Sequence, residues 1–169
     1  GLSPFDAAAS RWATGSANPF VRLLAFYTDI GKSTLYLLIA FAAMAFASLS
    51  DWRQHGVTAK ARLALIYAQS SYVFAAIAIT GILVTVLKFI FGRARPKFLD
   101  TIGPDGFFSG WGVGYDFTSF PSGHATTMGA LAAILALWYP KLRPFTLTAC
   151  ALVALSRVAA RAHFPSDVI

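Results

Sequence analysis

Three short stretches of this chain carry residue types that could bind and transfer a phosphate. They are Lys88 with Arg95-Pro96, then Pro121-Ser122-Gly123-His124, then Ser156-Arg157 followed by His163 and Asp167. Ammonium and guanidinium groups bind the oxygens of a tetrahedral anion, and a histidine can attack phosphorus or supply a proton. If the fold brings them together, these side chains form a phosphate site with a nucleophile and an acid.

The second stretch is expected to begin a helix, because Pro121-Ser122 follows an aromatic loop and precedes an apolar run. First-turn N–H groups of a helix lack intrahelical acceptors and bind phosphate oxygens. Ser122 adds a hydroxyl donor, and Gly123 leaves its amide open to an anion. His124 could protonate a leaving oxygen. The alternative is that Ser122 and Gly123 only cap the helix.

Lys88 and Arg95 would lie roughly 10 Å apart along an unbroken helix. Gly92 and Pro96 should end the helix between them, so that both cations can clamp one anion. The alternative is a lysine that reaches the interface beside a basic surface cluster at 93–97.

Arg157 lies in an otherwise apolar segment, where an unpaired cation costs at least about 2.5 kcal/mol, so it needs an anionic partner. Arg161, one turn further on, could share that partner or merely reach the interface. Phe164 precedes a proline and should end the helix at His163. Asp167 then lies within a turn of His163 and could hold one imidazole nitrogen, leaving the other as a nucleophile. Separately, the two could be an interfacial histidine and a helix-dipole aspartate.

The composition indicates which elements position these residues. With 57% hydrophobic and 12% charged residues, the chain is expected to be an all-α, polytopic transmembrane helical bundle in one domain, 1–169. Its 14 Lys and Arg are scattered between apolar segments instead of lining one face, so no nucleic-acid partner is expected. Cys150 is the only cysteine, which excludes a disulfide or a multi-cysteine metal site within the chain.

Four apolar stretches are long enough to suggest spans, since about 20 helical residues cross a hydrocarbon core. These are 33–50, 63–91, 120–139 and 144–163. Cations in the connections 51–62 and 140–143 favour the cytoplasmic side for both, which leaves the loop 92–120 outside. The three polar stretches would then converge on the extracytoplasmic face of the plasma (inner) membrane.

Residues 1–32 are predicted to form two short interfacial helices before the transmembrane core, 33–169. Ser3 with Asp6 is typical of a capping box, and Asn18-Pro19 indicates a second helix start. The second helix has an apolar face that would lie against headgroups or pack on the bundle. That face comprises Phe20, Leu23, Leu24 and Tyr27. No secretory signal peptide is expected.

In this order, K-x6-R-P, P-S-G-H and S-R-x5-H-x3-D resemble the three signatures of the type 2 phosphatidic acid phosphatase (PAP2) superfamily. Every signature position is filled between residues 88 and 167. The resemblance implies a metal-independent phosphatase with a six-helix membrane core, related in fold to vanadium-dependent haloperoxidases and glucose-6-phosphatase. No metal or cofactor is expected. The first and last spans of such a core are not visible here, so we expect a longer protein.

The resemblance also implies a role for each matching residue. His163 would be the nucleophile that forms a phosphohistidine, and Asp167 would orient it. His124 would protonate the leaving oxygen and then activate water. The remaining positions would hold the nonbridging phosphate oxygens, namely Lys88, Arg95, Ser122, Gly123 and Arg157.

The expected partners are the bilayer and a lipid phosphate or pyrophosphate substrate. The family includes enzymes acting on undecaprenyl pyrophosphate, phosphatidylglycerophosphate, phosphatidic acid and lipid A 1-phosphate. Aromatic residues of the 97–120 loop could let a lipid approach laterally, or form an ordinary interfacial belt. They are Phe98, Phe107, Phe108, Trp111, Tyr115, Phe117 and Phe120. A vanadate-dependent haloperoxidase-like enzyme and a non-catalytic lipid carrier or transporter remain alternatives.

Overall fold

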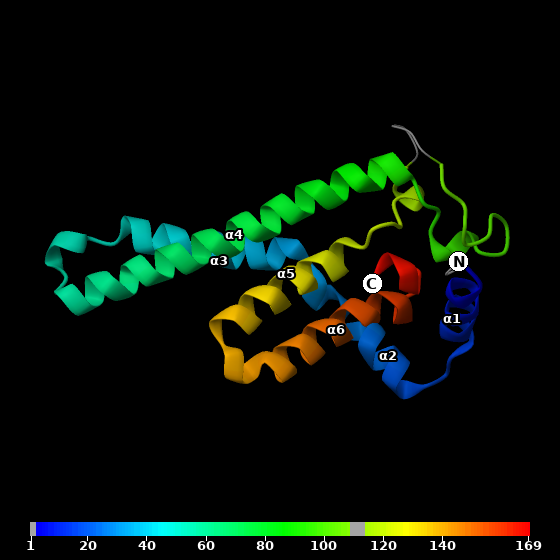
Figure 1. The fold of residues 1–169 in the computed structure, drawn as a ribbon, viewed down its shortest axis with the longest axis horizontal. Coiled ribbons are helices and arrows are strands. Elements are labelled where there is room, and N and C mark those ends of the chain that lie inside the picture. Colours follow the sequence, from blue (N-terminus) through cyan, green and yellow to red (C-terminus); the bar gives the residue numbers. More distant parts are fainter. Residues whose placement is uncertain (1–2, 109–113) are drawn as a thin grey trace.

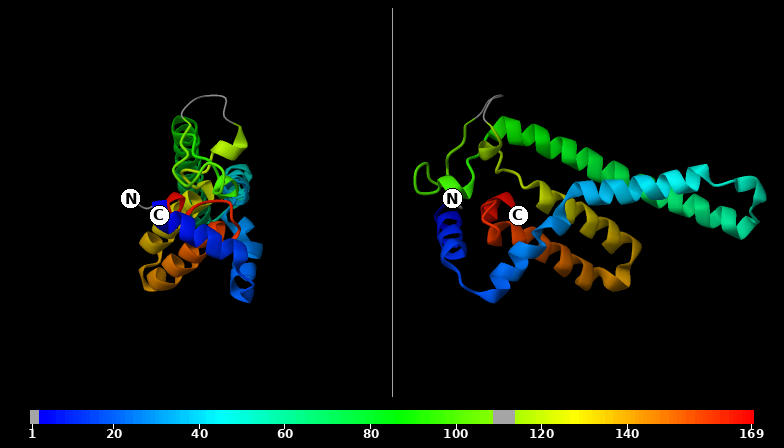
Figure 2. Two further views of the ribbon diagram at one scale, coloured as in Figure 1. Left: turned by 90° about the vertical axis from the view of Figure 1, so that its right-hand side faces the viewer. Right: turned by 180° about the vertical axis from the view of Figure 1, so that it is seen from behind.

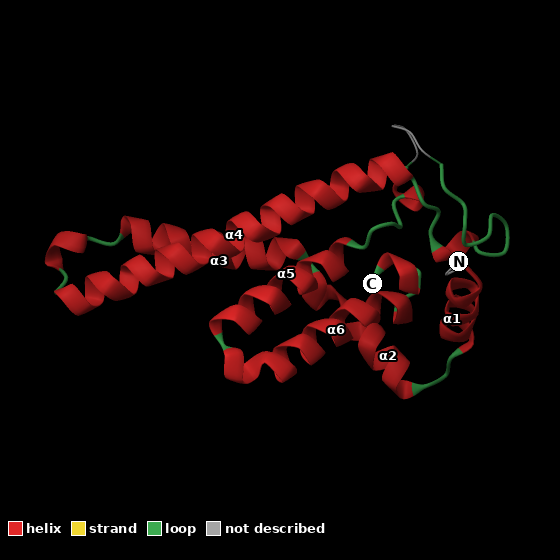
Figure 3. Ribbon diagram, viewed as in Figure 1, coloured by secondary structure: helices red, strands yellow, loops and turns green. Residues whose placement is uncertain are grey.

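The chain folds almost entirely into helices. The computed structural model describes residues 3–108 and 114–169, and within them it has no β-strand, only an isolated antiparallel bridge between Arg93 and Phe107 (Figure 3). The α-helices are α1 (Ser3–Gly15), α2 (Pro19–Phe26), α3 (Ser33–Leu49), α4 (Val57–Phe91), α5 (Gly123–Trp138) and α6 (Arg143–Ala159). Two short 3₁₀ helices matter for the site, η1 (Tyr27–Gly31) and η6 (Pro165–Asp167). The prediction of an all-α fold is confirmed.

Two antiparallel helix pairs form the body of the fold (Figures 1 and 2). α3 packs along α4, α5 packs along α6, and α5 also packs against α4. α2 and η1 lie against α6, on the side of the bundle away from α4. As a result, the last turn of α4, the first turn of α5 and the last turn of α6 lie toward the same end of the fold, on the right in Figure 1. These turns contain Lys88, Gly123, His124, Ser156 and Arg157, and the other signature residues lie beside them, in the segments that follow α4 and α6 or precede α5.

The helices occupy the positions predicted for four spans, but fewer of them are long enough to cross a membrane unaided. Within the described residues, α4 and the segment Pro140–Ala159 qualify by length and apolarity. α2 and η1 qualify with α3 only if these segments, bent by 41°, are taken as one span. α5 is apolar but has 16 residues, about 24 Å, short of a core about 30 Å thick. The count of four was therefore too high by this criterion, and two or three spans are supported.

The surface of these helices fits a lipid environment. Leu38 on α3 and Ile82 on α4 are 63% and 64% exposed, a state that water would penalise but hydrocarbon would not. Many other large apolar side chains on α3, α4 and α6 are also exposed. Such a surface is typical of a membrane protein.

The two short N-terminal helices are present as predicted. Asn18 caps α2, with its side-chain oxygen accepting the Phe20 N–H at 2.9 Å and Pro19 in the first turn. Val21 is buried, while Phe20 and Leu23 are more than half exposed. α2 therefore packs on the bundle through one side and presents an apolar side outward. The capping role predicted for Asp6 does not describe its main contacts, because its carboxylate is buried and is bound by residues far along the chain.

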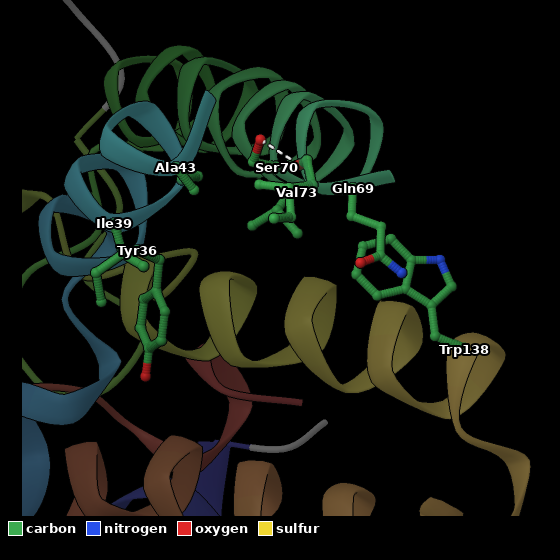
Figure 4. Close-up of a pocket in the computed structure, with 9 residues that line it drawn as sticks. Tyr36, Ile39, Ala43, Gln69, Ser70, Val73 and Trp138 are labelled. Atoms are coloured by element: carbon green, nitrogen blue, oxygen red, sulfur yellow. Dashed lines mark hydrogen bonds between the residues drawn. The ribbon is translucent and has the colours of Figure 1, made fainter. Parts of the chain in front are cut away.

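A cavity of about 260 Å³ lies between α3, α4 and the C-terminal end of α5 (Figure 4). Tyr36 and Ile39 line it from α3, Gln69 and Val73 from α4, and Trp138 from α5. Its described lining includes none of the signature residues. The chemistry predicted from the sequence therefore lies elsewhere.

Candidate active site

The end of α4 forms as its sequence predicts. Gly92 takes the left-handed conformation with φ 55°, which glycine adopts without strain, and its N–H bonds to the Lys88 carbonyl. Lys88 Nζ donates to the Thr118 carbonyl at 2.7 Å. The Arg95 guanidinium reaches Thr118 Oγ1 at 3.5 Å and donates to the Ala162 carbonyl at 2.9 Å. The chain between α4 and α5 thus holds both cations of the first signature around Thr118.

The first turn of α5 is capped by Ser122. Its hydroxyl oxygen accepts the Ala125 N–H at 3.5 Å, and its own N–H donates to the Asp167 carbonyl at 2.8 Å. Ser122 is fully buried, and its observed contacts are those of a helix cap. Its hydroxyl hydrogen remains available as a donor. A Cβ on Gly123 would meet only Val84, at an ordinary 3.9 Å. The fold itself does not require glycine at this position.

His163 is held by a backbone carbonyl. Its Nδ1 lies 2.7 Å from the Ser119 carbonyl oxygen and 3.7 Å from Asp167 Oδ2, so the carbonyl makes the closer contact. A carbonyl only accepts hydrogen bonds, so Nδ1 carries the hydrogen and Nε2 keeps the lone pair that a nucleophile needs. Burial, above all, lowers the pKa of this imidazole below its ordinary value of 6.5, even though Asp167 acts in the opposite direction. His163 is therefore neutral at pH 7.

Asp167 has close contacts in addition to the one predicted with His163. Its carboxylate accepts the Ser119 hydroxyl at 2.6 Å and the Phe164 N–H at 2.8 Å, and it pairs with Arg93. Burial opposes ionisation of Asp167, yet His163, Ser119 and the Arg93 guanidinium hold its pKa below the ordinary value. The aspartate thereby fixes both Ser119, whose carbonyl holds His163, and the turn that follows His163. It orients the histidine mainly through these neighbours.

A buried ion network behind the site was not predicted. Arg93 is 3% exposed and bridges two carboxylates, Asp167 and Asp6, with its Nη2 at 2.7 Å from Asp6 Oδ2. Asp6 also accepts the Ser166 N–H at 3.0 Å, and Arg93 donates to the Ser166 hydroxyl at 2.7 Å. α1 is thus tied to the turn that carries Asp167. No sequence signal marks Asp6 or Ser119 for this role, and Arg93 was assigned only to a surface cluster.

His124 lies against a glycine of η1. A Cβ on Gly31 would come within 2.9 Å of the imidazole Cδ2, so the ring needs the space that glycine leaves. Its Nε2 is buried and has no hydrogen-bond partner among the described residues. The positive charge of Arg157 acts on this imidazole, as expected for groups gathered in one region. A buried nitrogen without a partner in the protein is ready to bond a ligand.

Arg157 is buried in the last turn of α6, where the sequence placed it. One guanidinium nitrogen donates to Thr28 Oγ1 at 2.9 Å, and Nε is buried without a partner in the described part of the chain. The anionic partner expected for it is not supplied by a carboxylate there, since Thr28 is neutral. Arg161 is exposed and lines a separate cavity with Arg22, so it does not share the role.

The charge balance distinguishes the signature cations from their neighbours. Arg93 is neutralised by two carboxylates. Lys88, Arg95 and Arg157 have no carboxylate within 4.0 Å in residues 3–108 and 114–169. They contact carbonyls, hydroxyls and the ring of Tyr115 instead. Three cations without a carboxylate partner, close to donors that are partly unsatisfied, have the chemistry that an anion site requires. The described residues 3–108 and 114–169 include no group of three or more His, Cys, Asp or Glu side chains that could hold a metal ion.

The aromatic loop is only partly available to a lipid. Phe117 stacks on Phe98 at 5.6 Å and meets Phe108 edge-to-face at 5.2 Å, so these rings support one another. Tyr115 is 72% exposed and lies over the Arg95 guanidinium. Trp111 lies outside the described residues. Lateral approach of a lipid through this loop therefore remains a prediction.

The PAP2 superfamily model matches residues 69–169, well over half of the chain and all three signatures. This chain belongs to the PAP2 superfamily. Two curated PAP2-type relatives, each named lipid A 1-phosphatase, come from Rhizobium etli and Rhizobium johnstonii. Each is 40% identical over 117 residues, which is 66% of this chain and 49% or 46% of the relative. The chain therefore spans about half the length of these relatives. No solved structure matches it.

Proposed function

We propose that this PAP2 chain is the catalytic part of a membrane lipid phosphatase. The observation that carries the proposal is a set of three buried or half-buried cations that have no carboxylate partner among the described residues: Lys88, Arg95 and Arg157. Buried charges without a partner destabilise a folded protein, so their presence here indicates that a bound anion pairs with them. A phosphate group, with a charge spread over three nonbridging oxygens, matches three such donors.

The proposed reaction proceeds in two steps. His163 Nε2 attacks phosphorus, a P–N bond forms, and the bond from phosphorus to the lipid oxygen breaks as His124 donates a proton to that oxygen. Water then attacks the phosphohistidine while His124 accepts its proton, the P–N bond breaks, and inorganic phosphate leaves. Ser122, Gly123 and the three cations hold the nonbridging oxygens in both steps, and Asp167 keeps His163 in position.

Lipid A 1-phosphate is the first substrate to test, because the two curated relatives bear that name. Undecaprenyl pyrophosphate, phosphatidylglycerophosphate and phosphatidic acid are the other candidates. The distribution of cations in the connections 51–62 and 140–143 supports an active site on the extracytoplasmic side of the inner membrane. All four candidates present a phosphate at a bilayer surface.

The proposal is tested by phosphate release from these four lipids in detergent micelles containing EDTA. The purified full-length protein is expected to release phosphate from at least one lipid, fastest from lipid A 1-phosphate, at a rate that EDTA leaves unchanged. No release from any of them would contradict the phosphatase function. Release that stops with EDTA and returns with Mg²⁺ would contradict the metal-independent mechanism.

Gly31→Ala is expected to lower turnover by about 10²-fold, because the new methyl group displaces the His124 ring from its place. The fold should persist, because the close contacts are with His124 alone, although its Cβ, 3.0 Å away, can move only with a small shift of the backbone. The rate constant for phosphate release, measured with a thermal melt in detergent, checks both expectations. Gly129→Ala in α5 is the matched control, because a Cβ there meets nothing within 4 Å. Equal activity of the two variants would show that His124 needs no such support.

A further inference from the structure

A small polar cavity lined by two arginines lies apart from the candidate active site. It has a volume of about 260 Å³ and is formed where α1, α2 and the end of α6 meet. Arg22 lines it from α2 and Arg161 from the turn after α6, and Thr14 and Ser16 contribute hydroxyl groups. Its described lining includes none of the signature residues. Two guanidinium groups from distant parts of the sequence therefore share one space.

Neither arginine side chain has a partner in the described part of the chain. Arg22 and Arg161 make no side-chain hydrogen bond, ion pair or cation–π contact there. An arginine after a helix often bonds the last carbonyl groups. Here backbone N–H groups bond those carbonyls, which belong to Ser156, Arg157 and Val158. Because two like charges in one space repel each other, an anion between them would be stabilising.

The backbone of Arg161 gives an independent observation. Its φ of 56° lies in the left-handed region, and no other residue except glycine has a positive φ in the described chain. A residue with a Cβ is strained there, whereas glycine is not. Strained backbone of this kind is typical of functional sites. The arginine side chain makes no contact in the described protein that offsets the strain, which leaves a ligand as its partner.

The surroundings of the cavity indicate where its ligand comes from. Trp12 on α1 and Phe20 and Leu23 on α2 are each more than half exposed. Short helices with exposed aromatic and apolar side chains lie at the bilayer surface, where the phosphate groups of phospholipids are found. The volume is below the range of about 300–1,000 Å³ typical of drug-sized ligands, so it suits a headgroup and not a whole lipid. Arginine binds phosphate through paired hydrogen bonds.

We propose that Arg22 and Arg161 form an accessory site for the phosphate group of an anionic phospholipid, separate from the phosphate site of the proposed reaction. The bound headgroup joins α2 to the end of α6. α1 also lines the cavity, and Asp6 of α1 accepts the Ser166 N–H at 3.0 Å, next to Asp167. The phospholipid thereby steadies the helices that hold the catalytic turn.

The test measures binding of labelled phosphatidylglycerol to the purified full-length protein in detergent. Arg161→Gly removes one guanidinium and relieves the backbone strain. It is expected to weaken binding by at least about tenfold and, without lipid, to raise the melting temperature by about 2–4 °C. A purely structural role of Arg161 would lower the melting temperature instead. Arg22→Gln should weaken binding similarly and leave the lipid-free melting temperature unchanged, because its side chain has no partner among the described residues.

Arg53→Gln is the matched control, because Arg53 is also exposed, lies in the turn between α3 and α4, and carries the same charge. It should bind the lipid as the wild type does. Equal weakening in Arg53→Gln would mean that only net charge matters and would overturn the site. Binding that is lost in Lys88→Gln but kept in Arg161→Gly would place the lipid in the active site and contradict the proposal. Inorganic phosphate that displaces the label as well as unlabelled phosphatidylglycerol does would overturn the assignment to a lipid. None of these measurements requires turnover, so they test the accessory site separately from the phosphatase function.

Discussion

Replacing His163 with alanine is expected to reduce phosphate release from the lipid substrate by at least about 10⁴-fold, because the proposed covalent step then has no nucleophile. The cations that bind the substrate remain, so lipid binding should persist. The measurement is single-turnover release of labelled phosphate, together with trapping of the labelled protein by rapid denaturation at alkaline pH, where a phosphohistidine survives.

The wild-type protein should carry the label, and His163→Ala should not. In His124→Ala the label should accumulate if hydrolysis of the phosphohistidine slows more than its formation, and should be lost if formation slows more. His55→Ala is the matched control, since His55 is an exposed histidine in the turn between α3 and α4, far from the site. A label that persists in His163→Ala would assign the nucleophile to another residue. Full function in His163→Ala would instead support a lipid carrier.

Arg93→Met is expected to destabilise the folded protein by about 3–5 kcal/mol, the usual effect of removing one partner from a buried ion pair. Asp6 and Asp167 are 1% and 3% exposed, so both carboxylates would stay buried without their cation. The turn that follows His163 would lose its anchor, and activity should fall with stability. Unfolding in a detergent series, followed by circular dichroism, measures the change.

Arg22→Met provides the control, because Arg22 is an exposed arginine on α2. The double variant Asp6→Asn with Arg93→Met should recover part of the lost stability, since one of the two unpaired charges is then removed. If Arg93→Met unfolds at the same detergent concentration as Arg22→Met, the network contributes nothing measurable to the fold. The link between α1 and the catalytic turn would then be incidental.

The features that were predictable from the sequence depend on local signals. Gly92 ends α4, Ser122 caps α5 and Asn18 caps α2, because each of these roles is set by a few neighbouring residues. The end of α6 was placed four residues too late, at His163 instead of Ala159. There the chain leaves the helix before Phe164-Pro165 forces it to, and Arg161 takes φ 56°. Proline marks the last possible helical residue, and the chain stopped earlier.

The features that were not predictable join distant residues. Arg93 meets Asp6 across 87 positions and Asp167 across 74, and no periodicity or motif connects such pairs. The same holds for Gly31, whose missing side chain makes room for His124. The carboxylate of Asp167 was expected to hold the imidazole, but the Ser119 carbonyl oxygen lies closer to Nδ1, at 2.7 Å against 3.7 Å for Asp167 Oδ2. The spacing of His163 and Asp167 predicted that the two residues lie close together. It could not predict which of their atoms form hydrogen bonds, because these depend on the position of Ser119.

The length of α4 has a consequence for how the protein sits in its membrane. Its 35 residues measure about 52 Å, some 20 Å more than the apolar layer can enclose upright. Either a steep tilt absorbs the excess, or the α3–α4 hairpin stands clear of the lipid on the side opposite Lys88. Lys60 and Arg62 lie on that far end of the helix, so in the tilted arrangement their two positive charges would be attracted to anionic headgroups at the membrane surface.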